Sequence, residues 1–170
     1  FGQGVACTPL QMLTAVNAIA NGGLMMQPRI VSQIIDGGSV IDLQPTVLGS
    51  PIPTETAQIV TNMMVQVVQG GEANAAIVPG YSIAGKTGTA QIPTPVGYEP
   101  DTSVASFIGF FPPEDPQVSI IVTLSRPAGY WGSAVAAPVF SRIAGRLVIL
   151  LGIPPDSVRQ TLQVEGAVGG

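Results

Sequence analysis

The sequence predicts an α+β fold in which one antiparallel sheet is flanked by helices. The predicted elements follow the order helix, ribbon, helix, three strands and helix, and the mostly short connections between strands favour antiparallel pairing. Residues 118–124 (VSIIVTL) place an apolar side chain at every second position, as a strand with one better-buried face should. With 170 residues, the chain is long enough for one domain or for a large piece of a bigger one.

Two helices are predicted in the first half of the chain. Thr8 is a suitable N-cap, Pro9 suits the first helical position, and Gln11 completes a capping box. This helix should end at residues 21–23, where the sequence reads Asn-Gly-Gly. A second helix is expected over residues 54–69, because its apolar residues follow helical spacing and a glycine pair comes next.

The remaining β-rich runs predict a hairpin and a three-stranded sheet. Residues 30–35 and 39–43 flank an Asp-Gly pair, which favours a tight turn and a small surface ribbon. A longer, proline-rich loop is expected between the first two strands of the sheet. The predicted sheet strands are residues 81–92, 104–111 and 118–124.

The last predicted helix begins near Pro138 and ends at Gly152. Two arginines four residues apart interrupt its apolar run and lie on one face, so it is interpreted as a helix of a globular domain. No apolar run reaches the roughly 18 residues of a membrane span. Residues 1–155 are expected to form the domain portion, and residues 156–170 a disordered tail. The abrupt start at Phe1 indicates that an upstream segment is missing.

The composition excludes several classes of function. Hydrophobic residues make up 46% of the chain and charged residues only 9%, and the net charge is −4. Nucleic-acid binding requires a basic face, so no nucleic-acid partner is expected. The chain has no histidine and one cysteine, so the usual zinc ligands are missing and neither a metal nor a cofactor is expected. The single thiol, Cys7, is expected to pack as a small, partly buried group.

The stretch GYSIAGKT at residues 80–87 matches the phosphate-loop pattern G-x-x-x-x-G-K-[ST]. Such a loop binds phosphate because a strand leads into it and a helix begins at the lysine. Here the preceding segment ends on Pro79, and residues 88–97 contain two glycines and two prolines. Because no helix can begin in such a segment, the ATP-binding interpretation is rejected.

The same letters predict different chemistry if residues 84–91 (AGKTGTAQ) form a strand at the edge of the sheet. Lys86 is the only lysine of the chain. Gly88, between Thr87 and Thr89, would let a ligand backbone approach while two hydroxyls and the ammonium gather around one carboxylate. The alternative is a solvated lysine on a surface strand, and these four residues alone do not decide between the two.

Lys-Thr-Gly is one of three motifs of the serine penicillin-recognising enzymes, alongside Ser-x-x-Lys and Ser-x-Asn. The chain as a whole resembles one branch of these enzymes, the transpeptidase domain of class B penicillin-binding proteins. The resemblance is carried by six blocks in the family's order: GQGVACTPLQM at 2–12, IANGG at 19–23, MMVQVV at 63–68, GYSIAGKTGTAQ at 80–91, FIGFFP at 107–112 and AAPVF at 136–140.

The resemblance implies a D,D-transpeptidase that cross-links peptidoglycan through a serine acyl-enzyme, the same serine being acylated by penicillins. Lys86 would supply positive potential near the substrate carboxylate, and Thr87 and Thr89 would donate hydroxyl hydrogen bonds to it. Gly88 would keep the strand open. The backbone N–H of Thr89 would complete the oxyanion hole, which makes Thr89 the expected catalytic position.

The chain departs from the family pattern in one respect. The residue three before Lys86 is Ile83, so Ser-x-x-Lys is absent, and no asparagine has a serine two residues earlier. In the family both motifs lie N-terminal to this region, so the nucleophile is expected in a missing N-terminal part of the same protein. This chain alone is therefore expected to be inactive and unlabelled by penicillin. Residues 118–124 are expected to present an unpaired apolar edge.

The resemblance also implies partners and a location. The expected ligands are peptidoglycan stem peptides and β-lactams, and the expected partners are a cell-wall glycosyltransferase and proteins of division or elongation. The catalytic domain would lie on the outer face of the bacterial cell membrane, with no membrane span within this chain. A β-lactamase-related protein, which shares Lys-Thr-Gly, and a non-catalytic sensor domain, which would bind β-lactams without turnover, remain alternatives.

Overall fold

The computed structural model describes residues 4–168, so residues 2 and 3 of the first block and residues 169–170 of the predicted tail lie outside the described part. In chain order its elements are α1 (Pro9–Ala20), β1 (Met25–Met26), β2 (Gln33–Asp36), β3 (Ser39–Asp42), β4 (Val47–Gly49), α2 (Thr54–Gln69), a short 3-10 helix (Asn74–Ala76), β5 (Ala84–Thr94), β6 (Gly97–Phe111), β7 (Val118–Ser125), α3 (Gly132–Leu150) and α4 (Asp156–Val168).

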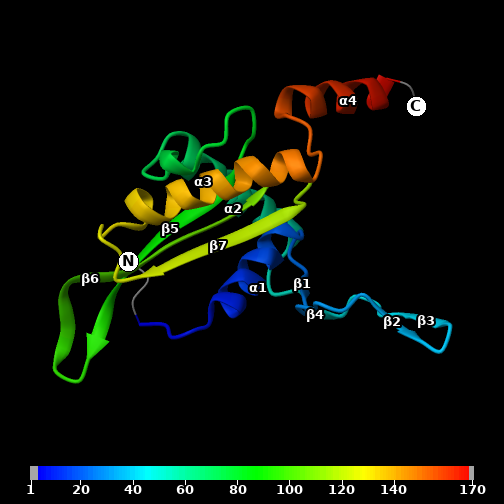
Figure 1. The fold of residues 1–170 in the computed structure, drawn as a ribbon. Helices are drawn as coiled ribbons and strands as arrows, with labels where there is room; N and C mark the ends of the chain where they lie inside the picture. Colours follow the sequence, from blue (N-terminus) through cyan, green and yellow to red (C-terminus); the bar gives the residue numbers. More distant parts are fainter. Residues whose placement is uncertain (1–3, 169–170) are drawn as a thin grey trace.

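The centre of the molecule is an antiparallel sheet with the strand order β5-β6-β7. Helix α3 packs on one face of this sheet, and α1 and α2 lie against the other (Figure 1). The predicted α+β fold, with one antiparallel sheet flanked by helices, is confirmed. Among residues 4–168, β5 and β7 are the two edge strands of this sheet, so β7 has the unpaired edge that was expected.

Both helices of the first half begin and end as the sequence predicts. The Thr8 hydroxyl accepts a hydrogen bond from the backbone N–H of Gln11 at 3.2 Å, and the Gln11 side chain accepts one from the N–H of Thr8 at 2.9 Å. This pair is the predicted capping box. Helix α2 spans the predicted residues Thr54–Gln69 with Pro53 as its N-cap, and no side chain caps it.

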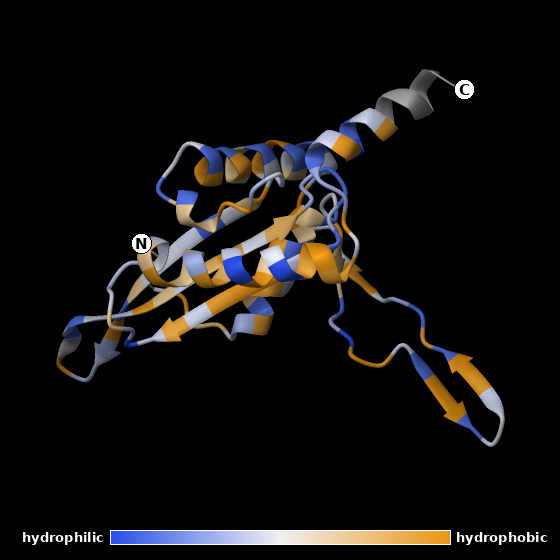
Figure 2. Cartoon of the chain, turned by 45° about the horizontal axis from the view of Figure 1, so that its top comes forward, coloured by the Kyte–Doolittle hydropathy of each residue, from blue (hydrophilic) through white to orange (hydrophobic). Residues whose placement is uncertain are grey.

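Strands β2 and β3 form the predicted ribbon, which projects from the body of the molecule (Figure 1). Its turn is Gly37-Gly38 instead of the predicted Asp-Gly pair, because Asp36 is still paired with Ser39. Both glycines have positive φ, 53° and 87°, as a tight two-residue hairpin turn requires. Both strands are rich in apolar residues (Figure 2), and the side chains of β2 and β3 remain exposed.

Strands β5 and β6 extend through most of the region predicted to be a long loop. Pro93 pairs with Tyr98 and Thr94 with Gly97, so the hairpin continues to its tip. A proline fits here because β5 is an edge strand in the described sheet, where a missing N–H breaks no ladder. A shift in register between Gln91 and Pro93 accommodates the extra residues of β6. The loop prediction rested on the prolines and was wrong because an edge strand accommodates Pro93.

Helix α3 begins at Gly132, well before the predicted start near Pro138. A proline inside a helix costs about 3 kcal/mol, but here the surrounding turns contain fully buried side chains. The Phe140 ring packs edge-on against Phe107 of the sheet, with 4.6 Å between ring centroids. By length and composition α3 is long and apolar enough to cross a membrane, but its buried face packs on the sheet as a core helix.

Helix α4 corrects the prediction of a disordered tail, because the chain is helical from Asp156 to Val168. The backbone N–H of Asp156 donates to the Gly80 carbonyl at 2.9 Å, and its carboxylate accepts from Ser82 at 2.7 Å. Arg159 bridges Asp156 and Glu114 at 2.8 and 2.5 Å. Burial alone would lower the pKa of Arg159, but these hydrogen bonds raise it. Contacts with distant segments thus hold the helix start, and the tail's composition does not reveal them.

Candidate functional site

Strand β5 places the Lys-Thr-Gly motif at an edge of the described sheet. It pairs there with β6, through Lys86 with Ile108 and Gly88 with Ser106. Thr87 lies inside the strand, and no helix begins at this residue. The rejection of a phosphate loop is confirmed, since the residues after the lysine form a strand and not a helix N-terminus.

Lys86 and Thr87 meet at a single carboxylate, which belongs to Glu72. The Lys86 Nζ atom lies 2.8 Å from Glu72 Oε1, and the Thr87 hydroxyl donates to the same oxygen at 2.9 Å. Lys86 Nζ also donates to Thr87 Oγ1 at 3.1 Å. The hydrogen bonds from Lys86 and Thr87 and the charge of Lys86 together lower the pKa of the Glu72 carboxyl below its ordinary value. The pair of donors thus binds a carboxylate as an anion.

Sequence reasoning did not find Glu72. The residue lies on the loop that joins α2 to β5, shortly after the glycine pair that ends the helix. Glu72 is the only acidic residue between Gly70 and Ile83, and Lys86 is the only lysine. A loop that returns from a helix to an edge strand runs beside that strand. The opposite charges of Glu72 and Lys86 were therefore the signal in the sequence that could have predicted their contact.

The Thr89 hydroxyl does not join Lys86 and Thr87 at Glu72 but contacts the start of α3. Its hydroxyl oxygen accepts a hydrogen bond from the backbone N–H of Gly132 at 3.1 Å, which joins β5 to the first turn of α3. The structure therefore brings Lys86 and Thr87 together and directs the hydroxyl of Thr89 towards α3. The expected contact of the Thr89 hydroxyl with the same carboxylate, and the oxyanion role of its N–H, stay predictions.

Gly88 makes room for its cross-strand neighbour. A Cβ atom built at Gly88 would lie 2.5 Å from the Ser106 hydroxyl oxygen, which is closer than real contacts allow. The two residues are paired in the ladder between β5 and β6. Any side chain at position 88 would therefore push Ser106 aside and change the surface beside Lys86.

A hollow of about 690 Å³ lies beside the motif, between the sheet and the helices α1 and α2. Residues 86–90 of β5, which include Lys86, Thr87 and Thr89, and Ser106 of β6 contribute polar side chains to its lining, whereas the two helices contribute mainly apolar ones. Cys7 also lines it and is exposed, which corrects the prediction that this thiol is partly buried. The motif thus borders a space large enough for a peptide or a small molecule.

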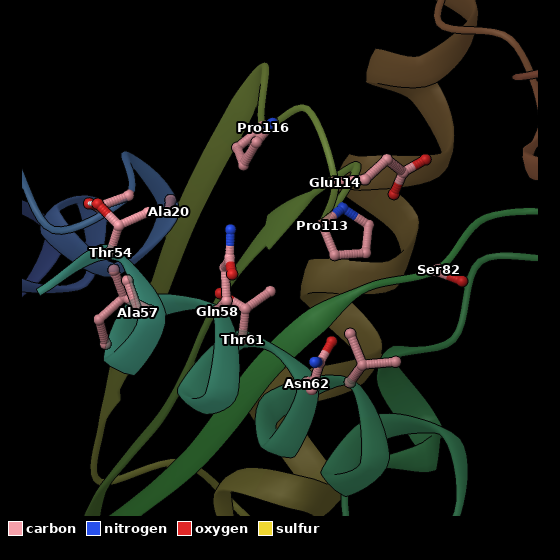
Figure 3. Close-up of a pocket in the computed structure, with 13 residues that line it drawn as sticks. Ala20, Thr54, Ala57, Gln58, Thr61, Asn62, Ser82, Pro113, Glu114 and Pro116 are labelled. Carbon is pink, nitrogen blue, oxygen red and sulfur yellow. Dashed lines mark hydrogen bonds between the residues drawn. The ribbon is translucent and has the colours of Figure 1, made fainter. Parts of the chain in front are cut away.

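A second hollow, of about 590 Å³, lies between α1, α2 and the segment after β6 (Figure 3). Gln58 and Thr61 of α2 line it together with Pro113. Its charged wall residue, Glu114, is paired with Arg159. Among the described residues that line this hollow, none belongs to the Lys-Thr-Gly motif and none is a cation that could hold a carboxylate. Within residues 4–168 no cluster of histidine, cysteine, aspartate and glutamate could hold a metal ion.

Comparison with known proteins identifies relatives across most of the chain. The family model described as penicillin binding protein transpeptidase domain matches residues 1–145. Stage V sporulation protein D of Bacillus subtilis is 36% identical over 160 residues, which are 91% of this chain and 25% of that protein. The probable peptidoglycan D,D-transpeptidase PenA of Neisseria gonorrhoeae is 35% identical over 159 residues, which are 91% of this chain and 26% of that protein.

The fold agrees with a solved relative. The apo structure of penicillin-binding protein 3 from Mycobacterium tuberculosis shares 36% sequence identity and superposes with a TM-score of 0.81, over 91% of this chain and 37% of that one. The chain spans about a quarter of the length of the two curated relatives. Matched by the family model over most of its length, the chain belongs to the penicillin-binding protein transpeptidase family, as part of a class B transpeptidase domain.

Proposed function

We propose that this chain supplies the carboxylate-binding strand of a serine D,D-transpeptidase that cross-links peptidoglycan stem peptides. One observation carries the proposal: Lys86 and Thr87 both contact one carboxylate oxygen at the edge strand β5. The stem peptide of such an enzyme ends in the free carboxylate of D-Ala-D-Ala. An ammonium and a hydroxyl side by side supply the charge and the donors that this group needs.

The proposed reaction is an acyl transfer with a serine outside this chain as the nucleophile. The serine oxygen gives its proton to the base and attacks the carbonyl carbon of the penultimate D-alanine. The bond to the terminal D-alanine then breaks, and this residue leaves as free D-alanine after its amine takes up the proton. The acyl group then passes to an amine of a neighbouring stem peptide. Lys86 and Thr87 hold the terminal carboxylate during this step. The backbone N–H of Thr89 supports the oxyanion, where one donor is typically worth about 3 kcal/mol.

The edge position of β5 supports a binding mode for the peptide. An edge strand carries backbone groups without ladder partners, so an extended peptide can bind as a further strand. Gly88 adds no side chain to this surface, and the hollow beside the motif gives the peptide's side chains room. Residues 1–155 form the portion of the domain to which we assign this role.

The proposal extends to β-lactams and to partners. Penicillin-binding protein 3 of Mycobacterium tuberculosis has been solved in complex with aztreonam and with ampicillin. We infer that such anionic drugs meet the same two side chains here. The nucleophile and its lysine base come from another segment of the same protein, since these 170 residues contain no Ser-x-x-Lys. We place the enzyme at the outer face of the bacterial cell membrane, with a glycosyltransferase and division or elongation proteins as partners.

The test uses Lys86→Ala and Thr87→Val in the intact enzyme, with the rate of acylation by a fluorescent penicillin as the measurement. Each change removes a hydrogen bond to a charged group, worth about 1.5–3 kcal/mol, so the acylation rate constant should fall roughly 10- to 150-fold. Arg142→Ala is the charge-matched control, because Arg142 is exposed on α3 and does not line the hollow. Unchanged rates in both variants, at unchanged melting temperatures, would remove β5 from the site.

A further inference from the structure

Glu72 occupies the position that the proposed function gives to the ligand's carboxylate. Its Oε1 atom accepts hydrogen bonds from Lys86 at 2.8 Å and from Thr87 at 2.9 Å. These two side chains are the ones proposed to hold the terminal carboxylate of the substrate. Two carboxylates at one site repel each other, so a ligand cannot take up both donors while Glu72 remains there.

The hydrogen bonds of Glu72 to Lys86 and Thr87 are weak enough for a ligand to displace them. Its side chain is 65% exposed and that of Lys86 is 53% exposed, so water competes for both groups. Exposed ion pairs of this kind contribute little to stability. Glu72 also lies on a loop, outside both α2 and β5. Rotation about its own side-chain bonds is enough to free Lys86 and Thr87, and no buried contact has to open.

We propose that Glu72 is an internal substitute for the ligand's carboxylate, which occupies Lys86 and Thr87 in the free protein and is displaced when a carboxylate ligand binds. This inference rests on the proposed function of β5. Exchange of one carboxylate for another keeps the ammonium paired in both states, and those ligands are the ones whose binding Glu72 opposes. The exchange also weakens the binding of those ligands, because a tethered carboxylate competes at a high effective concentration.

A purely structural ion pair predicts a different result. If Glu72 only fastened its loop to β5, its removal would lower stability and leave ligand affinity unchanged or weaker. Competition predicts the opposite sign for affinity, and only for ligands that carry a carboxylate. The two roles are therefore separated by measuring one dipeptide in two forms, as the free acid and as the C-terminal amide.

The experiment titrates the full 170-residue chain with N-acetyl-D-alanyl-D-alanine and with its C-terminal amide, and follows the backbone signals of Lys86 and Thr87 by NMR. Glu72→Gln and Glu72→Ala should each bind the acid about two- to fivefold more tightly than the wild type, the range that exposed ion pairs imply. Their affinity for the amide should stay the same. Glu55→Gln is the matched control, since it removes an exposed carboxylate that does not line the hollow.

The outcomes separate this inference from the function on which it rests. Equal or weaker binding of the acid by both Glu72 variants overturns the inference and leaves the function of β5 intact. Tighter binding of acid and amide alike also overturns it, because the effect would then be steric. If the acid fails to shift the signals of Lys86 and Thr87 in any variant, the proposed function fails together with the inference. In the wild type, saturation with the acid should return the pKa of Glu72 to its ordinary range.

Discussion

Gly132→Ala should displace the first turn of α3 from the strand that carries the motif. A Cβ atom at this position would lie 2.4 Å from the carbonyl oxygen of Gly88, 2.4 Å from that of Ser106 and 3.2 Å from the Ser106 nitrogen. All three are backbone atoms of paired strands, so they cannot give way as a flexible side chain would. The helix start must instead move outwards by roughly 1 Å to restore ordinary contact distances.

The cost of Gly132→Ala follows from two effects. Forcing an extra carbon into a packed region costs about 1–3 kcal/mol. The outward shift also weakens the hydrogen bond from the Gly132 N–H to the Thr89 hydroxyl, now 3.1 Å long, which is worth about 0.5–1.5 kcal/mol. Together these effects should lower the free energy of unfolding by about 1.5–4.5 kcal/mol.

Gly145→Ala is the matched control in the same helix. Its new Cβ would lie 4.0 Å from the nearest side-chain atom, a methyl carbon of Val78, so there is no clash. Alanine in a helix interior should then gain about 0.5–1 kcal/mol over glycine. Urea unfolding of both variants should give a lower free energy of unfolding for Gly132→Ala and a higher one for Gly145→Ala. The dependence of this free energy on urea concentration should be the same in both. The reasoning is refuted if Gly132→Ala is as stable as the wild type or more stable.

Two further predictions concern contacts of β5, and a third concerns the missing nucleophile. Thr89→Val should lower the free energy of unfolding by about 1–3 kcal/mol, because the Gly132 N–H loses its acceptor; urea unfolding measures it, and exposed Thr123→Val on β7 is the control. Because Glu72 has a lowered pKa in the folded state, its contribution to stability should be present above about pH 4.5 and be lost as the pH falls through that lowered value. Melting temperatures of wild type and Glu72→Gln should therefore converge as the pH is lowered, and a gap that does not narrow in acid contradicts the contact. Finally, intact-mass measurement after incubation of this chain with penicillin should show no adduct, and a stoichiometric adduct on any of its serines would refute the missing-nucleophile interpretation.

Local signals in the sequence predicted the elements that depend on neighbouring residues. The capping box of Thr8 and Gln11 placed the start of α1, and the glycine pair after Gln69 placed the end of α2. The change to β-rich runs located the three strands of the sheet, though not the full length of β5 and β6, and the glycines and prolines after Thr87 excluded a helix there. Each of these signals acts within a few residues, so a single sequence is enough to read it.

Features that depend on distant contacts could not be read in the same way. The start of α4 depends on Arg159 meeting Glu114, and on the backbone of Asp156 meeting Gly80. The early start of α3 depends on a core that outweighs an interior proline. Glu72 became part of the site only because its loop returns beside β5. In each case the sequence shows the residue but not its partner.

The site combines a fixed part with a movable part, and the two are built differently. Lys86 and Thr87 lie on a strand that β6 holds from one side and that α3 holds through the Thr89 hydroxyl. Donors fixed in this way can bind a carboxylate without first being ordered, which preserves affinity. Glu72 lies on a loop and is largely exposed, so it can leave without disturbing them. If the proposed function holds, a side chain at Gly132 should weaken ligand binding, because it would displace the start of α3 from the strand that fixes Lys86 and Thr87. A change at Glu72 should affect only the displaceable carboxylate.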